Sequence, residues 1–246
     1  MPFERPSVIL YDRWYKTEDQ QAALMLHKAR ELLMRRQIML VNALRAHMAE
    51  LGMVAPRGRG KVRDITAVIE DEEDESIPAL AKAALKPLVA QLRAAEESTS
   101  ALDDEIMAWH KNNAASQRLA TIPGIGFLTA SAIAATVPDP SFFRSGREFA
   151  AWLGRVPRQN SSGEKERLGR ISKQGNRYIR RLLVIGATSM LRYARARTAP
   201  GADWVKRLLE RRPPRLVTVA MAKKTARIAW ALMARGETYR APAAAA

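Results

Sequence analysis

Two long stretches of the chain carry apolar residues at helical spacing, and shorter segments rich in glycine, proline and charge lie around them. The first stretch, residues 17–51, contains no glycine or proline, so we predict a single long helix. Thr17 followed by Gln20 fits a capping box, and Gly52 supplies a stop. The expected apolar stripe consists of Ala22, Leu26, Ala29, Leu33, Leu40, Leu44, Met48 and Leu51.

A second helical stretch follows Pro78 and runs to about residue 112, with Pro87 as a potential kink. Its recurring apolar residues are Leu80, Leu85, Leu88, Leu92, Leu102, Ile106 and Trp109. Two long helices joined by a compact segment can pair antiparallel, so residues 17–113 are predicted to form a long, coiled-coil-like helical arm that could also associate with another subunit.

Between the two stretches lie six consecutive carboxylates, from Glu70 to Glu75. A metal site is one interpretation. Consecutive side chains point in different directions and like charges repel, so a solvated linker or helix start is the better interpretation.

After Asn113 the composition changes, and residues 117–137 read as a short helix, a Pro-Gly-Ile-Gly turn and a second helix of small residues. This is the helix-hairpin-helix pattern, in which Gly124 and Gly126 would let backbone amides approach a phosphate. The alternative is a tight turn between packed helices. Further helices are expected at about 176–195 and 215–235. The whole is predicted to be mainly α, with a C-terminal domain over 114–240, a remnant at 1–16 and a tail at 241–246.

The charge of the chain indicates what kind of partner it binds. The chain has 41 Lys and Arg against 25 Asp and Glu, a formal net charge of +16 and a pI of about 10.7. Eleven basic and three acidic residues lie between Arg144 and Arg181, in a glycine-broken loop region that can include a short hairpin. A polyanion is the natural partner of such a surface, because its binding releases counterions. The nearby aromatic residues, expected to anchor a small core, are Phe143, Phe149 and Trp152.

Other chemistries are disfavoured by what the chain contains. It has no cysteine, and the spacing of its three histidines, His27, His47 and His110, is no metal signature, so helix-surface or helix–helix positions are expected for them. No apolar stretch of about 18 residues and no secretory signal are found, so we expect a cytoplasmic protein with no membrane partner. A membrane-surface role fits poorly, since the positive charge concentrates in a turn-rich loop.

Within the basic loop, Ser161 and Ser162 precede Gly163 and are surrounded by arginine and lysine. Clustered cations can orient a phosphodiester and stabilise its transition state, so a serine here suits phosphoryl transfer from DNA. The alternative is a flexible turn that only contacts phosphate. The expected nucleic-acid contacts are Gly124, Gly126, Arg155, Arg158, Lys165, Arg167, Arg170, Lys173 and Arg177.

One continuous run carries a resemblance to a known family: TIPGIGFLTASAIAATVPDPSFFRSGREFAAWLGRVPRQNSSGEKERLGRISKQGNRYIRRLLVIGA. This run resembles the C-terminal transposase domain of the bacterial insertion-sequence family that combines a DEDD carboxylate domain with a catalytic serine and is guided by a bridge RNA. Residues 17–52 are similar to the helical segment joining that family's two domains. The resemblance covers about residues 17–239.

This resemblance implies that Ser162, with Ser161 as the alternative, attacks a DNA phosphate and forms a covalent phosphoserine intermediate without a high-energy cofactor. It also implies DNA and a guide RNA as partners, and dimers that assemble into a tetramer.

The family's RuvC-like carboxylate domain, which binds magnesium, has no counterpart here, because only sixteen residues precede Thr17 and these contain just Glu4 and Asp12 as carboxylates. We therefore expect a truncated transposase or recombinase that holds no cofactor of its own and needs a partner's carboxylates. The alternative is a non-catalytic nucleic-acid-binding fragment that modulates an intact transposase.

Overall fold

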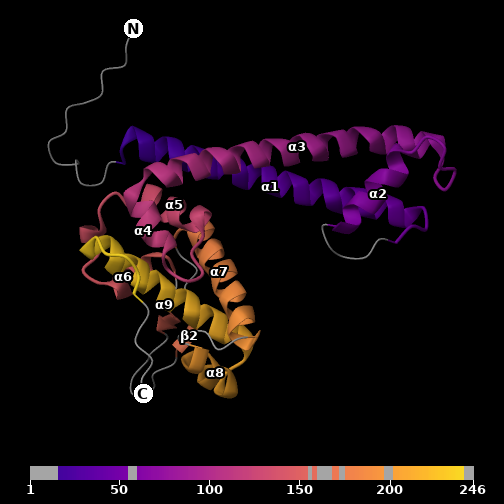
Figure 1. Ribbon diagram of the computed structural model, residues 1–246. Coiled ribbons are helices and arrows are strands. Elements are labelled where there is room, and N and C mark those ends of the chain that lie inside the picture. Colours follow the sequence, from indigo (N-terminus) through magenta and orange to yellow (C-terminus); the bar gives the residue numbers. More distant parts are fainter. Residues whose placement is uncertain are drawn as a thin grey trace, which may run out of the picture. The chain divides into compact units, whose positions relative to one another are not determined.

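The computed structural model describes residues 16–54, 60–154, 157–159, 168–171, 175–196 and 202–240. Helices dominate this part of the chain (Figure 1), which confirms the mainly α prediction. The chain divides into two compact units. Residues 25–105 form the arm unit, and residues 1–24 together with 106–246 form the C-terminal unit.

Helix α1, Glu18–Glu50, begins and ends where local signals predict. The Thr17 hydroxyl accepts a hydrogen bond from the Gln20 amide at 3.1 Å, and the Gln20 side chain accepts one from the Thr17 amide at 3.1 Å. These reciprocal bonds satisfy two amides that the helix cannot pair, so the capping box is confirmed. Gly52, with φ +81°, adopts the left-handed conformation that ends the helix.

In the arm unit, α1 packs antiparallel to α3, Ala79–Asn112, and polar residues occupy part of the buried seam. Arg30 pairs with Asp103, and the buried Gln37 donates to the carbonyl of Ala95 and the hydroxyl of Thr99, both at 2.8 Å. Because these polar groups find partners on α3, the seam can accommodate them.

The first half of the predicted stripe on α1 is wrong at two of its four positions, while Leu26 and Leu33 are partly buried. Ala22 and Ala29 are exposed, whereas Ala23 and His27 are buried. The second half is largely correct, since Leu40, Leu44 and Met48 are buried; Leu51, at 37% exposed, is not. On α3, Leu80 is 85% exposed, and Pro87 lies within the helix without ending it.

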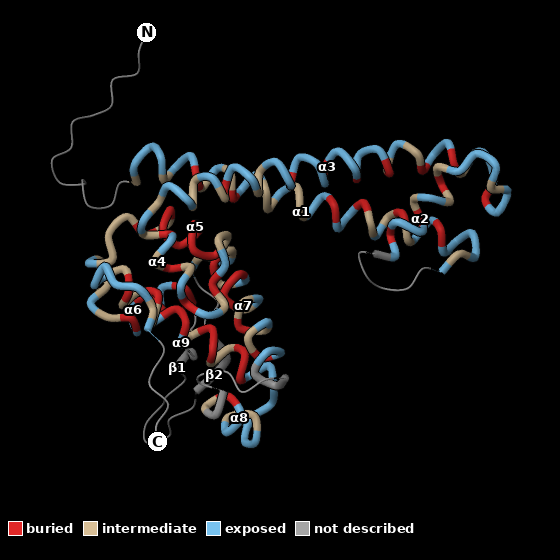
Figure 2. The backbone as a smooth tube through the Cα atoms, in the orientation of Figure 1, coloured by how far each residue is buried: buried red, intermediate tan, exposed pale blue. Residues whose placement is uncertain are grey.

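A further helix, α2 (Gly60–Glu70), packs between α1 and α3 and completes a three-helix core, seen as buried segments in Figure 2. Ile65 and Ile69 of α2 are buried in this core, together with Leu44 of α1 and Val89 of α3. The core closes the end of the arm unit where α1 and α3 are joined.

The acidic segment that follows α2 is stabilised by cations of α3. The Lys82 ammonium donates to the carbonyls of Asp71 and Asp74, and Lys86 pairs with Glu72 at 2.8 Å. In the described part of the chain, no group of three or more histidine and carboxylate side chains could hold a metal ion. The segment thus connects α2 to α3 and is held by the lysine side chains of α3.

The C-terminal unit builds its core from several helices around α5, Phe127–Thr136, whose residues 129–135 are all buried. Its further elements, in chain order, are α4 (Ala114–Ala120), the 3-10 turn η1 (Pro140–Phe142), α6 (Gly146–Trp152), β1 (Pro157–Gln159), β2 (Leu168–Ile171), α7 (Arg177–Ala196), α8 (Ala202–Arg211) and α9 (Pro214–Arg235). Helices α7 and α9 match the two predicted there, and α8 was not predicted.

The ends of the two long helices contribute to this second unit. The Gln20 side chain donates to the Ala134 carbonyl of α5 at 3.2 Å, and the Trp109 indole donates to the Asp19 carboxylate at 2.8 Å. No helix in the described ranges is long and apolar enough to cross a membrane.

His27 gives the arm unit a pH-dependent stability. Burial, and next the positive charge of Arg30, lower the pKa of this imidazole from 6.5 to about 4. The folded arm therefore binds fewer protons than the unfolded chain below pH 6.5, so stability is full above that pH and declines as pH falls toward 4. Between pH 7.5 and 5.0 the loss from this group should be about 2 kcal/mol.

Chemical denaturation at these two pH values, followed by circular dichroism, measures this loss. In His27→Gln the difference between the two pH values should shrink, because glutamine does not titrate. An unchanged difference would assign the pH dependence to other groups.

Candidate nucleic-acid interface

The turn between α4 and α5 contains both glycines singled out by the sequence, and they play different parts. Asn113 caps α4 by accepting from the Ser116 amide at 2.8 Å, and the chain then turns through Gly124, whose φ is +83°. A Cβ on Gly186 of α7 would lie 1.9 Å from the Gly124 carbonyl oxygen. The turn and α7 thus meet backbone to backbone, so Gly124 serves packing as the alternative interpretation held.

Gly126 differs from Gly124, because it lies at the surface with open space beside its Cα. It is the exposed N-cap of α5, it offers no capping side chain, and a Cβ there would meet no atom within 4 Å. Among the described residues, no hydrogen-bond acceptor is found for the amides of Phe127 and Leu128 in the first turn. These amides can therefore approach a phosphate, as the helix-hairpin-helix interpretation requires.

The basic loop is clamped where it leaves and re-enters the helical unit. Gly154 (φ +70°) ends α6, and a Cβ on Gly175 (φ +93°) would lie 1.9 Å from the Trp152 carbonyl oxygen. Asn176 then caps α7 by accepting from the Ile179 amide at 3.1 Å. The two ends of the loop are therefore held side by side at the C-terminal end of α6.

Between these ends, β1 and β2 pair antiparallel, with Pro157 opposite Ile171 and Gln159 opposite Leu168. The register shifts between these two pairs, where Arg158 of β1 faces the part of β2 that contains Arg170, so two predicted phosphate contacts lie on neighbouring strands. Their side chains are outside the described part of the structure.

Most of the predicted chemistry also falls outside the described residues. The two candidate nucleophiles, Ser161 and Ser162, lie between β1 and β2 in the chain, and so do Lys165 and Arg167. Arg155 and Lys173 are likewise outside. Arg177, the first residue of α7, is described and exposed.

The aromatic residues before the loop form a core, as predicted. The Phe143 ring lies 5.1 Å from that of Phe149 and 5.3 Å from that of Trp152, measured between centroids. Phe149 is fully buried, and Trp152 is 39% exposed. Phe143 and Phe149 thus anchor α6 in the core, as predicted, whereas Trp152 lies at its edge and is partly exposed.

The histidines occupy the helix contacts expected of them. His27 is buried in the arm seam, and His47 is exposed beside Glu50. The His110 ring lies 2.7 Å from the Ser116 hydroxyl through Nδ1, and burial lowers the pKa of His110.

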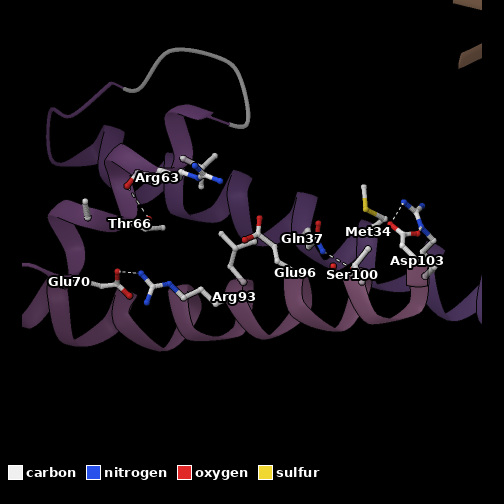
Figure 3. A pocket seen from close by; sticks show the side chains of 14 residues that line it. Met34, Gln37, Arg63, Thr66, Glu70, Arg93, Glu96, Ser100 and Asp103 are labelled. Atoms are coloured by element: carbon white, nitrogen blue, oxygen red, sulfur yellow. Dashed lines mark hydrogen bonds and ion pairs between the residues drawn. The ribbon is translucent and has the colours of Figure 1, made fainter. Parts of the chain in front are cut away.

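A polar hollow of about 720 Å³ in the arm unit is a poor candidate for binding a polyanion (Figure 3). Its Arg30 pairs with Asp103 and its Arg93 with Glu70, so most of its positive charge is already neutralised by carboxylates. The favourable Coulomb energy that would attract phosphates is therefore small.

Sequence reasoning overlooked cations on α9, where it predicted a helix and assigned no function. Lys223 and Lys224 lie four and three residues before Arg227 on α9, and all three border a hollow in the C-terminal unit. Their spacing is a signal in the sequence, but it is weak beside the eleven basic residues between Arg144 and Arg181. Within the described ranges, none of these three is paired with a carboxylate.

A helical frame with open backbone amides and unpaired cations has the features of a nucleic-acid-binding protein. Comparison with known proteins narrows this class. Residues 116–200 match the family model described as Transposase IS116/IS110/IS902 family. This match spans α4, the open turn, the clamped loop and α7.

Curated relatives match far more of the chain. It is 40% identical over 226 residues to "Probable family 20 transposase" of Pseudomonas aeruginosa, which covers 92% of this chain and 67% of that protein. It is 38% identical over 225 residues to "Transposase for insertion sequence element IS1111A" of Coxiella burnetii, covering 92% and 62%. A third relative, "Transposase for insertion sequence element IS1328" of Yersinia enterocolitica, is 35% identical, covering 91% and 66%.

The chain belongs to the IS116/IS110/IS902 transposase family. It spans 58 to 67% of the length of the four curated relatives that match over nine-tenths of it. The predicted relationship to insertion-sequence transposases is thereby confirmed at the level of the family.

The two glycine roles can be separated by mutation. Gly186→Ala should destabilise the C-terminal unit by about 1–3 kcal/mol, because its methyl group would overlap the Gly124 carbonyl. Gly126→Ala should cost less than about 1 kcal/mol, the usual scale of an N-cap preference, yet weaken DNA binding by crowding the open amides.

Thermal unfolding and fluorescence anisotropy with labelled duplex DNA measure the two effects. Equal stability losses in the two variants would contradict the assigned packing role of Gly186. Unchanged DNA affinity in Gly126→Ala would remove the α5 amides from the interface.

Proposed function

We propose that this chain carries the DNA-binding and strand-joining part of an insertion-sequence transposase, with Ser162 as the nucleophile. The observation that carries the proposal is the clamped basic loop within the segment that matches the family, residues 116–200. Because both ends of the loop are fixed against α6, a serine between β1 and β2 would be held near one place on the helical unit. Such positioning favours an in-line attack.

The proposed step conserves phosphodiester bonds. The Ser162 hydroxyl oxygen bonds to the scissile phosphorus and loses its proton, while the bond from phosphorus to one DNA strand breaks. The departing strand's oxygen takes up a proton, leaving phosphoserine on the protein. The free hydroxyl of the incoming strand then attacks this phosphoserine, restoring the serine and a phosphodiester without an external energy source.

Arginine and lysine around Ser162 would stabilise the negative charge that grows on the phosphate. A guanidinium can bind two phosphate oxygens at once, which orients the scissile group as well as neutralising it. In this proposal Arg155, Arg158, Lys165, Arg167, Arg170 and Lys173 bind the DNA strands around the nucleophile, Arg177 extends this surface onto α7, and the open amides after Gly126 hold a neighbouring phosphate.

The magnesium that the family resemblance implies does not fit the residues described here. They contain no group of three or more carboxylate and histidine side chains able to hold a metal ion. We propose that carboxylates outside the described residues, on this polypeptide or on a partner, complete the reaction. No step above depends on the metal.

Partners follow from the same resemblance. A guide RNA would share the basic surface with DNA, and dimers or tetramers would bring two serines to two strands. The arm unit offers a surface for self-association, because Met25, Leu32 and Met39 repeat every seven residues on α1 and are 60–71% exposed. Such a stripe favours packing against another helix, in the manner of a coiled coil.

The binding part of the proposal predicts a steep salt dependence. Replacing Arg155, Arg158 and Arg170 by alanine should weaken duplex binding and lower the salt slope by about one for each phosphate that is no longer neutralised. The matched control replaces Lys28, Arg35 and Arg63, three exposed arm residues with the same total charge. Lys82 is unsuitable as a control because it holds two backbone carbonyls.

Titrations by fluorescence anisotropy between 50 and 300 mM salt, as an approximate range, follow both variants. Equal losses of affinity in the two triple variants would mean that the loop does not bind the DNA. A salt-insensitive complex would exclude it as an electrostatic surface.

The catalytic part predicts a covalent adduct. With labelled donor and target DNA, guide RNA, magnesium and an intact family member present, this chain should form a protein–DNA species that survives denaturing electrophoresis. Ser162→Ala should abolish the adduct on this chain while leaving non-covalent DNA binding within about twofold, since the hydroxyl carries no charge. Ser161→Ala is the matched control and should keep the adduct.

An adduct that disappears in Ser161→Ala instead would move the nucleophile by one residue. No adduct in any combination would leave a nucleic-acid-binding module that modulates an intact transposase.

A further inference from the structure

The C-terminal unit has a basic groove that the α4–α5 turn does not line. It is a hollow of about 900 Å³ bordered by the start of α6, one face of α9 and the Trp204 indole of α8. Its cations are Arg147, Lys223, Lys224 and Arg227, and its indoles are Trp204 and Trp230. Of the expected phosphate contacts whose side chains the structure describes, none lines this groove.

Close packing gives the groove a fixed floor. A Cβ on Gly146 would lie 3.0 Å from the carbonyl oxygen of Arg227, so α6 begins almost in contact with the backbone of α9. The Trp230 indole donates to the Pro140 carbonyl at 3.1 Å, which fixes its ring. The Lys224 ammonium lies 4.5 Å from the Trp204 ring centroid, a cation–π contact that orients this charge.

Charge separates this groove from the hollow in the arm unit. None of the described residues lining the groove is acidic, whereas the arm hollow contains Glu70, Glu96 and Asp103 beside its arginines. In the described ranges no carboxylate pairs with Arg147, Lys223 or Arg227. Four cations around one hollow repel each other, and a polyanion relieves that repulsion.

The shape of the groove selects the kind of polyanion. Its described lining combines indoles and small or aliphatic side chains, such as Ile228, with the four cations, and Lys224 lies over the Trp204 ring. A concave, apolar floor with cations beside it can receive the bases of an unpaired strand and bind its phosphates, as in single-strand-binding grooves. A duplex presents only its outer backbone to such a hollow, because its bases are stacked inside.

The described lining has few groups that would prefer RNA to DNA. A ribose hydroxyl that donates a hydrogen bond needs an acceptor, and Ser145 has the one hydroxyl side chain among the described lining residues. Its oxygen already caps α6 by accepting from the Glu148 amide at 3.3 Å. No other described side chain of the lining can accept a hydrogen bond from the 2′-hydroxyl.

We propose that the basic groove binds an unpaired DNA strand, of the kind that strand exchange exposes. This inference rests on the proposed function, since it identifies a second binding surface for the same substrate. The groove would hold the displaced strand on α9 while the loop acts on the phosphate.

The test compares Lys223→Gln/Arg227→Gln with Lys28→Gln/Arg35→Gln, which removes the same charge from exposed positions on the arm. Anisotropy titrations use a labelled oligodeoxythymidine, a duplex and an oligouridine of equal length. The groove variant should bind oligodeoxythymidine about tenfold more weakly, with a salt slope smaller by about 1.4, and bind duplex within about twofold of wild type. The arm variant should match wild type with all three probes.

Photocrosslinking to an oligodeoxynucleotide carrying 5-iododeoxyuridine gives a second readout that does not depend on mutation. The crosslinked peptides of the wild-type chain should include residues 220–231 or Trp204. Unchanged oligodeoxythymidine affinity in the groove variant, or crosslinks that miss these residues, would overturn the inference. If the wild-type chain still binds duplex DNA, the proposed function would stand. Weakening confined to oligouridine would assign the groove to RNA and also overturn it. A wild-type chain that binds none of the probes would contradict the proposed function itself.

Discussion

Backbone-to-backbone contact at glycine is the constraint on which the C-terminal unit depends. Gly186 meets the carbonyl of Gly124, Gly175 meets that of Trp152, and Gly146 meets that of Arg227. A Cβ would prevent the contacts at Gly186 and Gly175, where it would lie 1.9 Å from the carbonyl oxygens, and would crowd the one at Gly146, where it would lie 3.0 Å away. Together they fix the α4–α5 turn on α7, both ends of the basic loop on α6, and α6 on α9. The surfaces proposed to bind nucleic acid are thus attached to a rigid frame, which is how a helical fold can position a loop.

The polar hollow of the arm unit and the basic groove of the C-terminal unit differ in how their charges are paired. In the arm hollow, Arg30 pairs with Asp103 and Arg93 with Glu70. In the C-terminal unit, the described cations on α9 have no carboxylate partner within the described ranges. Paired charges contribute to folding and specificity, whereas unpaired ones remain available for a polyanion. Charge pairing, more than charge content, therefore distinguishes the hollow in the arm unit from the groove that we propose as a binding surface.

What the sequence could predict follows from how far apart the interacting residues lie. The capping box of Thr17 and Gln20 is local, and the ends of the long helices were predicted within a few residues. The seam of α1 was misplaced in its first half, because His27 and Gln37 look like surface residues until α3 supplies their partners. The need for Gly186 could not be read from its neighbours either, since it arises from a carbonyl on another helix. The role of Ser162 rests on family resemblance, and its side chain lies outside the described residues.

Hydrogen–deuterium exchange with and without DNA tests most directly whether the C-terminal unit is a rigid frame that presents its basic surfaces to nucleic acid. In the free protein, amides of α5 and of the middle of α7 should exchange slowest, because they lie in the glycine-joined core. On adding DNA, protection should increase at the start of α5, in residues 155–177 and along α9, while residues 25–105 stay unchanged. Protection that appears mainly in residues 25–105, or a core that exchanges as fast as the helix ends, would contradict this account.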